Sequence, residues 1–264
     1  MLTEQQKNYY KENGFIKLEN VFTPGEFQIL SDEYDEIFNK KRNEGMEASW
    51  KGDLMKEAAN RAPVSVLSIH NLQFHSGVFT RLLTHPKLME ACEDVMGTPN
   101  ILLHHTKAHL KPPAKGAPYL MHQDYHYFPF KNDSMVAVFI HMDDSTPENG
   151  CLCVYPGSHK LGPLDDKGIE EKGEKYHYVD QNEFPIAGAT PICAKKGDVV
   201  IFSYLLIHGS YLNTSDRVRR MFLIQLMAAD DEPLNDEHKS PAQGMVLRGR
   251  NYKRDANMET RFKH

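Results

Sequence analysis

The pattern of short apolar stretches that begins at Ile101 constrains the fold most strongly. From this residue onward, the stretches alternate with Pro, Gly, Asn and Asp. Short apolar runs bounded by turn-forming residues are typical of β-strands, and their regular spacing indicates a barrel or a sandwich. The sequence therefore predicts a mainly β core, with strands expected over 101–110, 117–122, 134–142, 150–155, 191–193, 198–207 and 217–228.

The N-terminal third is expected to be helical instead. Thr3-Glu-Gln-Gln6 and Thr23-Pro-Gly-Glu26 have the spacing of a capping box, which marks a helix start. A third helix is predicted over 78–96, with an interruption at His85-Pro86. These helices would flank the β core.

Three segments are too polar or too weakly patterned for regular structure. We expect 43–62 to be mobile and 230–264 to be mainly loop. The stretch 161–189 is rich in Asp, Glu, Lys and Gly, with few apolar anchors before Phe184. A long segment of this kind is usually functional or disordered, so we predict an active-site lid.

Charge and cysteine content narrow the possible partners and the compartment. We expect the 264 residues to form a single domain over 1–264. Their net charge of −5 argues against a nucleic-acid or anionic-membrane partner. No apolar run approaches the roughly 20 residues needed to span a bilayer, and no signal peptide or peroxisomal address is evident. Four cysteines do not suggest a disulfide framework, so buried thiols and a cytoplasmic location are expected. The oligomeric state is not predicted.

Two His-x-acid pairs are candidate edges of a metal site. They are His122-Gln-Asp124 and His141-Met-Asp143, and residues two apart on a strand share one face. A chain with 14 His and 36 acidic residues is expected to contain such pairs by chance, so the spacing does not choose between them.

A distant histidine could complete the site. His208 follows the apolar run 199–207 and precedes Gly209, which suggests a strand end at an open mouth. Two histidines and one carboxylate are the ligand set of non-haem Fe(II) oxygenases, and they leave other coordination positions on the metal free. The alternative for His208 is a hydrogen-bonded core histidine.

A predicted hairpin then brings a guanidinium to this site. If residues 213 and 214 form its tip, Arg219 lies opposite His208, and Arg217 lies opposite Ser210. A guanidinium is suited to binding a carboxylate. The alternatives are an exposed arginine, or a one-residue slip that would exchange Arg219 for Arg220.

The strand predicted from Ile101 has one cationic face, with His105, Lys107, His109 and Lys111 at alternate positions. This face is either solvated or lines the cavity, where it would supply anion-binding donors. The aromatic residues of 125–130 either pack under the barrel rim or form a wall of the substrate pocket.

Five separated motifs, in this order, resemble those of the phytanoyl-CoA dioxygenase family. They are His122-Gln-Asp-Tyr-His-Tyr-Phe-Pro-Phe130, Glu148-Asn-Gly-Cys-Leu152, Pro156-Gly-Ser-His159, Lys196-Gly-Asp198 and Leu206-Ile-His-Gly-Ser210. The resemblance implies a double-stranded β-helix, or jelly roll, and an oxygenase that uses Fe(II), 2-oxoglutarate and O2. It also implies that His122, Asp124 and His208 bind iron, while Arg219 and Ser210 bind the 5-carboxylate of 2-oxoglutarate. His141 then has no counterpart among the metal ligands.

The expected reaction is oxidation of a small organic substrate, with release of succinate and CO2. Fold and iron site do not define that substrate. We expect His105, His109 and Tyr127 to bind it, and the surplus positive charge favours an anionic substrate. Alternatively, Lys107 only helps to hold 2-oxoglutarate. The competing function is a jelly roll that binds metal without being an oxygenase, as a binding protein or a metal-dependent hydrolase.

Overall fold

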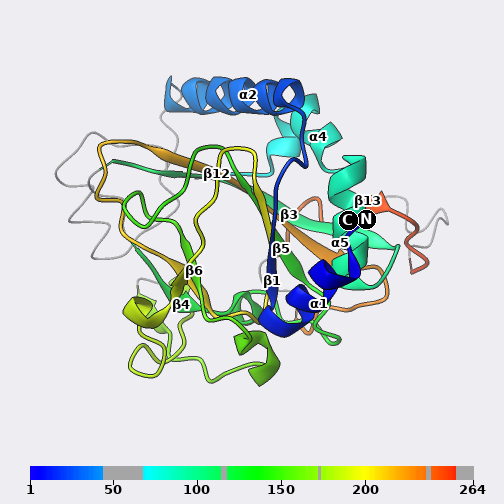
Figure 1. Ribbon diagram of the computed structural model, residues 1–264. Helices are drawn as coiled ribbons and strands as arrows, with labels where there is room; N and C mark the ends of the chain where they lie inside the picture. Colours follow the sequence, from blue (N-terminus) through cyan, green and yellow to red (C-terminus); the bar gives the residue numbers. More distant parts are fainter. Residues whose placement is uncertain (44–67, 114–117, 172–173, 236–238, 254–264) are drawn as a thin grey trace.

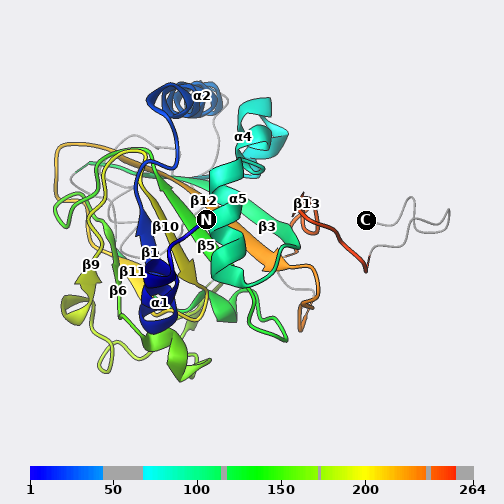
Figure 2. The ribbon, with the colours of Figure 1, turned by 45° about the vertical axis from the view of Figure 1, so that its right-hand side comes forward.

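Two antiparallel sheets face each other in the computed structural model, which describes residues 1–43, 68–113, 118–171, 174–235 and 239–253 (Figures 1 and 2). The larger sheet has the order β1-β10-β5-β12-β3-β13, with β2 paired to β3. Its strands are β1 (Phe15–Leu18), β2 (Ser68–His70), β3 (Ile101–Lys111), β5 (Val136–His141), β10 (Val199–Ser203), β12 (Arg219–Ala228) and β13 (Val246–Arg248). The smaller sheet has the order β4-β11-β6-β9 and comprises β4 (Tyr119–His122), β6 (Leu152–Val154), β9 (Thr190–Pro191) and β11 (His208–Ser210). This arrangement is a double-stranded β-helix, so the predicted fold is confirmed.

Alternation along the strands divides the apolar residues into two layers. On β5, Val138 and Ile140 pack in a cluster with residues of the helices, whereas Ala137 and Phe139 face the smaller sheet. The cluster that contains Ala137 and Phe139 also contains Val154 of β6, so side chains of both sheets meet in it. Because both faces of β5 are covered, all six of its residues are buried.

Helices from the N-terminal third cover the outer face of the larger sheet (Figure 1). Helix α1 (Glu4–Asn13) begins with a capping box at Thr3, and the same reciprocal bonds join Thr23 and Glu26 before α2 (Pro24–Asn43). The helix predicted over 78–96 is indeed interrupted, into α4 (Gly77–Leu82) and α5 (Pro86–Met96). The short 3-10 helices are η1 (Leu72–Phe74), η2 (Asp124–His126), η3 (Ser158–Leu161) and η4 (Ile186–Gly188).

The expected strand over 198–207 is wrong at its C-terminal end. Strand β10 stops at Ser203, whose carbonyl accepts a hydrogen bond from the Leu206 N–H in a turn. The chain crosses here from the larger sheet to the smaller one, and β11 starts at His208. Strands β2 and β13 were not anticipated, because three residues give too short a pattern. The predicted mobile segment 43–62 lies outside the described residues, except for its first residue.

The segment 161–189 contains a hairpin that was not anticipated, formed by β7 (Ile169–Glu171) and β8 (Glu174–Tyr176). Its few apolar anchors before Phe184 include Leu164 and Val179, which pack in a cluster with Met121 and Cys153. Its role as a lid remains a prediction.

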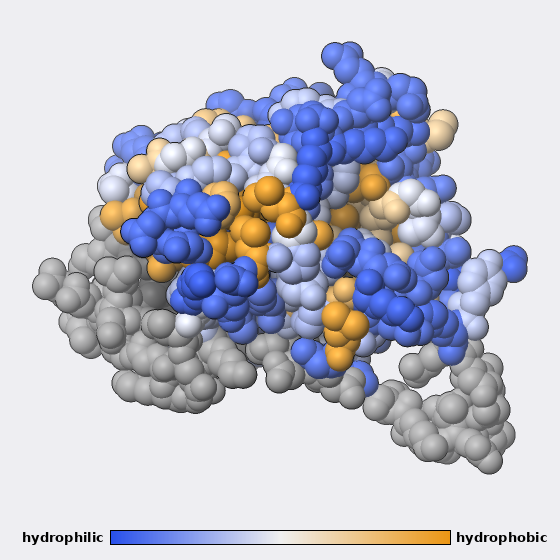
Figure 3. Space-filling model, turned by 90° about the horizontal axis from the view of Figure 1, so that it is seen from below, coloured by the Kyte–Doolittle hydropathy of each residue, from blue (hydrophilic) through white to orange (hydrophobic). Residues whose placement is uncertain are grey.

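The face seen in Figure 3 is largely hydrophilic, with apolar residues gathered near its middle. Within the described ranges, no helix is both long and apolar enough to cross a membrane.

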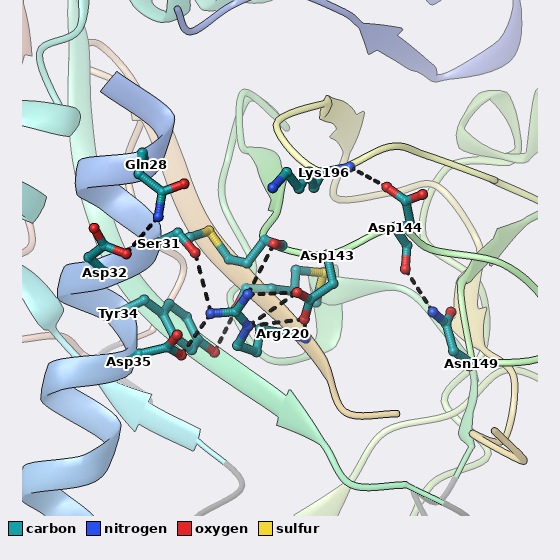
Figure 4. Close-up of polar contacts among 12 residues, drawn as sticks. Gln28, Ser31, Asp32, Tyr34, Asp35, Asp143, Asp144, Asn149, Lys196 and Arg220 are labelled. Atoms are coloured by element: carbon teal, nitrogen blue, oxygen red, sulfur yellow. Dashed lines mark hydrogen bonds and ion pairs between the residues drawn. The ribbon is translucent and has the colours of Figure 1, made fainter. Parts of the chain in front are cut away.

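Arg220 joins the outer face of β12 to the loop after β5 and to α2 (Figure 4). Its guanidinium donates to Asp143 at 2.7 Å and to Asp35 at 2.7 Å. The backbone N–H of Arg220 also donates to the Asp143 carboxylate, at 2.8 Å. These bonds commit Arg220 to the outer face, and alternation along β12 therefore turns Arg219 inward.

We predict that Arg220→Ala lowers the free energy of unfolding by about 1.5–3 kcal/mol, because it removes hydrogen bonds between charged groups at a half-buried site. Chemical denaturation measures this change. Arg217→Ala is the matched control: its exposed guanidinium lies 3.9 Å from Asp216, so a change within about 0.5 kcal/mol is expected. Equal stability losses in the two variants would contradict the stabilising role of the contacts that Arg220 makes with Asp143 and Asp35.

Candidate functional site

Three side chains from two distant parts of the sequence meet at the edge of the smaller sheet. The Nε2 atoms of His122 and His208 each lie 3.6 Å from Oδ1 of Asp124. The candidate ligand atoms all lie within 4.8 Å of one another, and no other such group of three occurs within the described ranges. First-row divalent ions bind such N and O ligands at about 2.0–2.2 Å, so one ion between the three side chains fits this spacing.

Contacts around the triad orient it for metal binding. His122 Nδ1 donates to the Leu120 carbonyl at 2.8 Å, and His208 Nδ1 donates to the Leu206 carbonyl at 2.9 Å. A carbonyl can only accept, so each ring in its neutral form carries its proton on Nδ1 and presents a lone pair at Nε2. Gln225 donates from Nε2 to Asp124 Oδ2 at 2.7 Å, which leaves Oδ1 facing the two imidazoles.

The electrostatics keep His208 and Asp124 in the protonation states that a metal requires. Burial, followed by the neighbouring His122, lowers the pKa of His208 to about 4, so this ring is neutral at pH 7. Burial alone would raise the pKa of the Asp124 carboxyl, but His208 and His122 outweigh it and the net shift is downward. The site therefore offers a neutral imidazole at His208 beside the Asp124 carboxylate.

The local backbone differs from the single strand that the spacing suggested. Strand β4 ends at His122, and Asp124 begins the 3-10 helix η2. Gln123 holds this bend, because its side-chain amide donates to the Leu205 carbonyl at 2.6 Å and accepts from the Leu164 N–H at 2.9 Å. The two ligands still converge, because the bend turns Asp124 toward His122.

His208 is positioned by its neighbours in the smaller sheet. It pairs with His122 on one side and with Val154 on the other. Before it, the Ile207 N–H donates to the Ser158 hydroxyl at 2.9 Å, which explains part of the Pro-Gly-Ser-His motif. After it, a Cβ on Gly209 would lie 2.5 Å from the carbonyl oxygen of Tyr119. Glycine at this position lets β11 approach β4.

The predicted hairpin between His208 and Arg219 is wrong. Strand β11 pairs with β4 and β6, whereas β12 pairs with β3 and β5, so the two strands lie in different sheets. The Asn213 side chain donates to the carbonyls of Lys111 and Pro112, and the connecting loop therefore packs against the end of β3. The Cα partner of Arg219 is Lys111.

Arg219 nevertheless faces the inside of the barrel, where it is buried. Lys111, its neighbour on β3, donates from Nζ to the Ser210 hydroxyl at 2.8 Å, across the space between the sheets. A Cβ on Gly150 would lie 2.8 Å from Lys111 Cδ, so glycine makes room for this lysine. Burial, followed by the charge of Arg219, lowers the pKa of Lys111 well below its usual range. Two adjacent buried cationic groups are costly without an anion.

The cationic face of β3 lies inside the barrel rather than in solvent. Burial lowers the pKa of His105 and of His109 well below the usual value, and it lowers the pKa of Lys107 to about 8. The charge of Asp124 acts on both His105 and Lys107 in the opposite direction, so this part of the face lies near the triad. His109 instead contacts Tyr119, with Nδ1 3.3 Å from its hydroxyl.

The aromatic residues that follow Asp124 divide between the two expected roles. Tyr125 and Phe128 pack against a core cluster that includes the buried Phe130. The Tyr127 ring lies beside His122, with 6.3 Å between the ring centroids. Its hydroxyl accepts from the N–H of His177 at 3.2 Å, which ties the segment 161–189 to the site.

The second His-x-acid pair, His141 and Asp143, does not form one side of a metal site. Asp143 binds Arg220 on the outer face, whereas His141 is fully buried on the inner side of β5. Sequence reasoning gave no role to Gln123 or Gln225, and it named Lys111 only as part of the cationic face. Only weak sequence signals could have indicated these two glutamines. Gln123 lies between two of the candidate metal ligands, and Gln225 is an even number of residues from Arg219, so both point to the same face of β12.

Comparisons with known proteins identify the class. The phytanoyl-CoA dioxygenase family matches residues 10–221. The chain is 30% identical over 237 residues to human peroxisomal phytanoyl-CoA dioxygenase, and the match covers 87% of this chain and 70% of that protein. It is also 30% identical over 244 residues to a probable alpha-ketoglutarate-dependent hypophosphite dioxygenase of Stutzerimonas stutzeri, covering 89% and 81%.

The solved structure of EctD from S. alaskensis with bound Fe superposes with a TM-score of 0.70 at 19% identity, and covers 94% of this chain and 88% of that one. This similarity supports the jelly-roll fold. Fold, triad and sequence matches together define a 2-oxoglutarate-dependent non-haem iron dioxygenase. Within that class, the chain belongs to the phytanoyl-CoA dioxygenase family.

Proposed function

We propose that this dioxygenase binds Fe(II) through His122, Asp124 and His208 and oxidises a small anionic substrate. The convergence of two Nε2 lone pairs and Asp124 Oδ1 on one point carries the metal assignment. Fe(II) bound there with 2-oxoglutarate would supply O2 activation, with succinate and CO2 as co-products. The protein contributes ligand orientation, binding of both substrates and exclusion of water.

Arg219 and Ser210 are proposed to hold the distal carboxylate of 2-oxoglutarate. Arg219 is buried within the barrel, and Lys111, its cross-strand partner, donates to Ser210 on the facing sheet. No described carboxylate forms an ion pair with Arg219 or Lys111. A metal-dependent hydrolase or a simple metal-binding jelly roll would not need this pocket, so its presence favours the oxygenase.

An anionic primary substrate is favoured by the inner face of β3. His105 and Lys107 lie near Asp124, and therefore near the metal end of the cavity rather than the Arg219 end. Tyr127 supplies an aromatic wall beside His122. The relative from Stutzerimonas is named for hypophosphite, a small oxyanion. We propose a substrate with a carboxylate, phosphonate or related oxyanion group, with His105, His109 and Tyr127 among its contacts.

The cellular setting is proposed from the thiols. All four cysteines are free, and three of them are buried. Reduced thiols are typical of the cytoplasm, which we propose as the location. The net charge of −5 supports small-molecule partners rather than nucleic acid or anionic membranes.

His122→Ala and His208→Ala are each expected to abolish metal binding and the formation of succinate from 2-oxoglutarate, since each removes one of three ligands. Equilibrium dialysis with Fe(II) under anaerobic conditions measures the binding directly. His141→Ala is the matched control, because His141 is a buried histidine away from the triad, and it should retain the metal. Loss of the metal in His141→Ala but not in His122→Ala would show that the assignment is wrong.

Arg219→Ala is expected to raise the KM for 2-oxoglutarate at least about 30-fold, which corresponds to about 2 kcal/mol for a lost buried charge contact. Steady-state succinate formation at varied 2-oxoglutarate measures it. Arg217→Ala serves as the control, because its guanidinium is exposed. An unchanged KM in Arg219→Ala would refute the proposed anchor.

Lys107→Met tests the charge of the primary substrate. We expect 2-oxoglutarate binding without substrate to change less than about threefold, while stimulation of succinate formation by small oxyanions falls at least tenfold, since a charge-assisted contact is lost. Hypophosphite, a simple alkylphosphonate and a short carboxylate are the probes. If Lys107→Met instead weakens 2-oxoglutarate binding without substrate, Lys107 serves the co-substrate and the anionic-substrate proposal loses its main support.

A further inference from the structure

Three polar side chains form a row across adjacent strands inside the barrel. Lys111 on β3 is the direct cross-strand partner of Arg219 on β12. Met221, two residues further along β12, is the partner of His141 on β5. Residues two apart on a strand share a face, so His141 is the diagonal neighbour of Arg219 on the inner face. The proposed function uses Arg219 but leaves His141 without a role.

Both His141 and Arg219 retain unused hydrogen-bonding capacity. His141 is 0% exposed, and neither of its ring nitrogens has a hydrogen-bond partner among the described residues. Arg219 is 4% exposed. In the same part of the chain its Nε has no partner, and its Nη1 contacts only the weak acceptor Met221 Sδ, at 3.7 Å. Two neighbouring strands thus direct unpaired polar groups into one buried space.

A packing role does not explain a histidine at this position. Phe139, two residues before His141 on β5, and Met221, its cross-strand partner, both belong to an apolar cluster. An apolar residue in place of His141 would extend this cluster without stranding polar atoms. A stranded buried polar group destabilises the fold, because it has lost its hydrogen bonds to water without a replacement. Burial, followed by the charges of Arg219 and Lys17, lowers the pKa of His141 to about 3. The ring is therefore neutral, with one N–H to donate.

We propose that His141 is a further binding residue for 2-oxoglutarate, and that its N–H donates to the distal carboxylate held by Arg219. This inference rests on the proposed role of Arg219. A carboxylate has two oxygens and about four acceptor positions, so it can accept from a guanidinium and an imidazole together. One anionic group would thus satisfy the unpaired donors of both strands and offset the buried charge of Arg219.

A ligand-binding role and a purely structural role of His141 predict opposite effects on the stability of the ligand-free protein. Phenylalanine resembles histidine in shape but has no polar ring atoms. His141→Phe should therefore raise the melting temperature of the protein in the absence of 2-oxoglutarate, because it removes stranded polar atoms. If His141 only supported the fold, the same replacement would lower the melting temperature.

The decisive experiment compares two ligands that differ at one end. Calorimetry on the Mn(II)-loaded protein would measure binding of 2-oxoglutarate and of 2-oxopentanoate, which has a methyl group in place of the distal carboxylate. His141→Phe should weaken 2-oxoglutarate binding at least about tenfold and change 2-oxopentanoate binding less than twofold. His141→Gln, which keeps an N–H donor, should recover part of the loss. Met142→Leu, on the outer face beside His141, is the control and should change neither.

The outcomes separate this inference from the proposed function. Equal weakening of both ligands by His141→Phe, or no weakening of either, would overturn the role of His141. If Arg219→Ala weakens 2-oxoglutarate binding in the same assay while His141→Phe does not, only the further inference fails. If Arg219→Ala has no effect, the proposed anchor itself fails.

Discussion

The pairing of β11 with β4 is the interaction on which the site depends. It places His208 opposite His122, although 86 positions separate them in the sequence. Neither strand is long, and each is held at its end by side chains: Gln123 binds the chain before β11, and Ser158 binds the N–H of Ile207. Loss of this register would move one imidazole away from Asp124. The motifs around the ligands thus hold the smaller sheet in the one register that assembles the triad.

The second constraint is the polar interior of the barrel. Side chains of two facing sheets normally interdigitate in an apolar core, and Phe139, Val154 and Leu223 belong to such a cluster here. On both sides of this cluster, however, the inner face carries polar groups. Gln225 contacts Asp124 at one end of β12, and Arg219 lies at the other end. Such groups are costly in a dry interior, and the proposed binding of 2-oxoglutarate and substrate between the sheets accounts for them.

The segment 161–189 links this interior to the surface. Its Leu164 N–H binds Gln123, which lies between two ligands, and the N–H of His177 binds the hydroxyl of Tyr127 beside His122. Binding at the metal centre and the position of this segment are therefore physically connected. These hydrogen bonds are the physical basis on which a lid over the site is proposed.

The sequence by itself determined the strand-rich core and the helix starts at Thr3 and Thr23, because alternation and capping are local signals. Spacing alone left two His-x-acid pairs, and only the resemblance of several motifs to a known family selected His122, Asp124 and His208. It could not determine how the strands pair. Arg219 was expected inside the barrel on the basis of a hairpin with His208, but it is turned inward because Arg220 is held outside by Asp143 and Asp35. Only the tertiary structure places Lys111 beside Arg219 and leaves His141 unpaired next to them, because these neighbours come from three strands whose pairing depends on packing across the whole sheet.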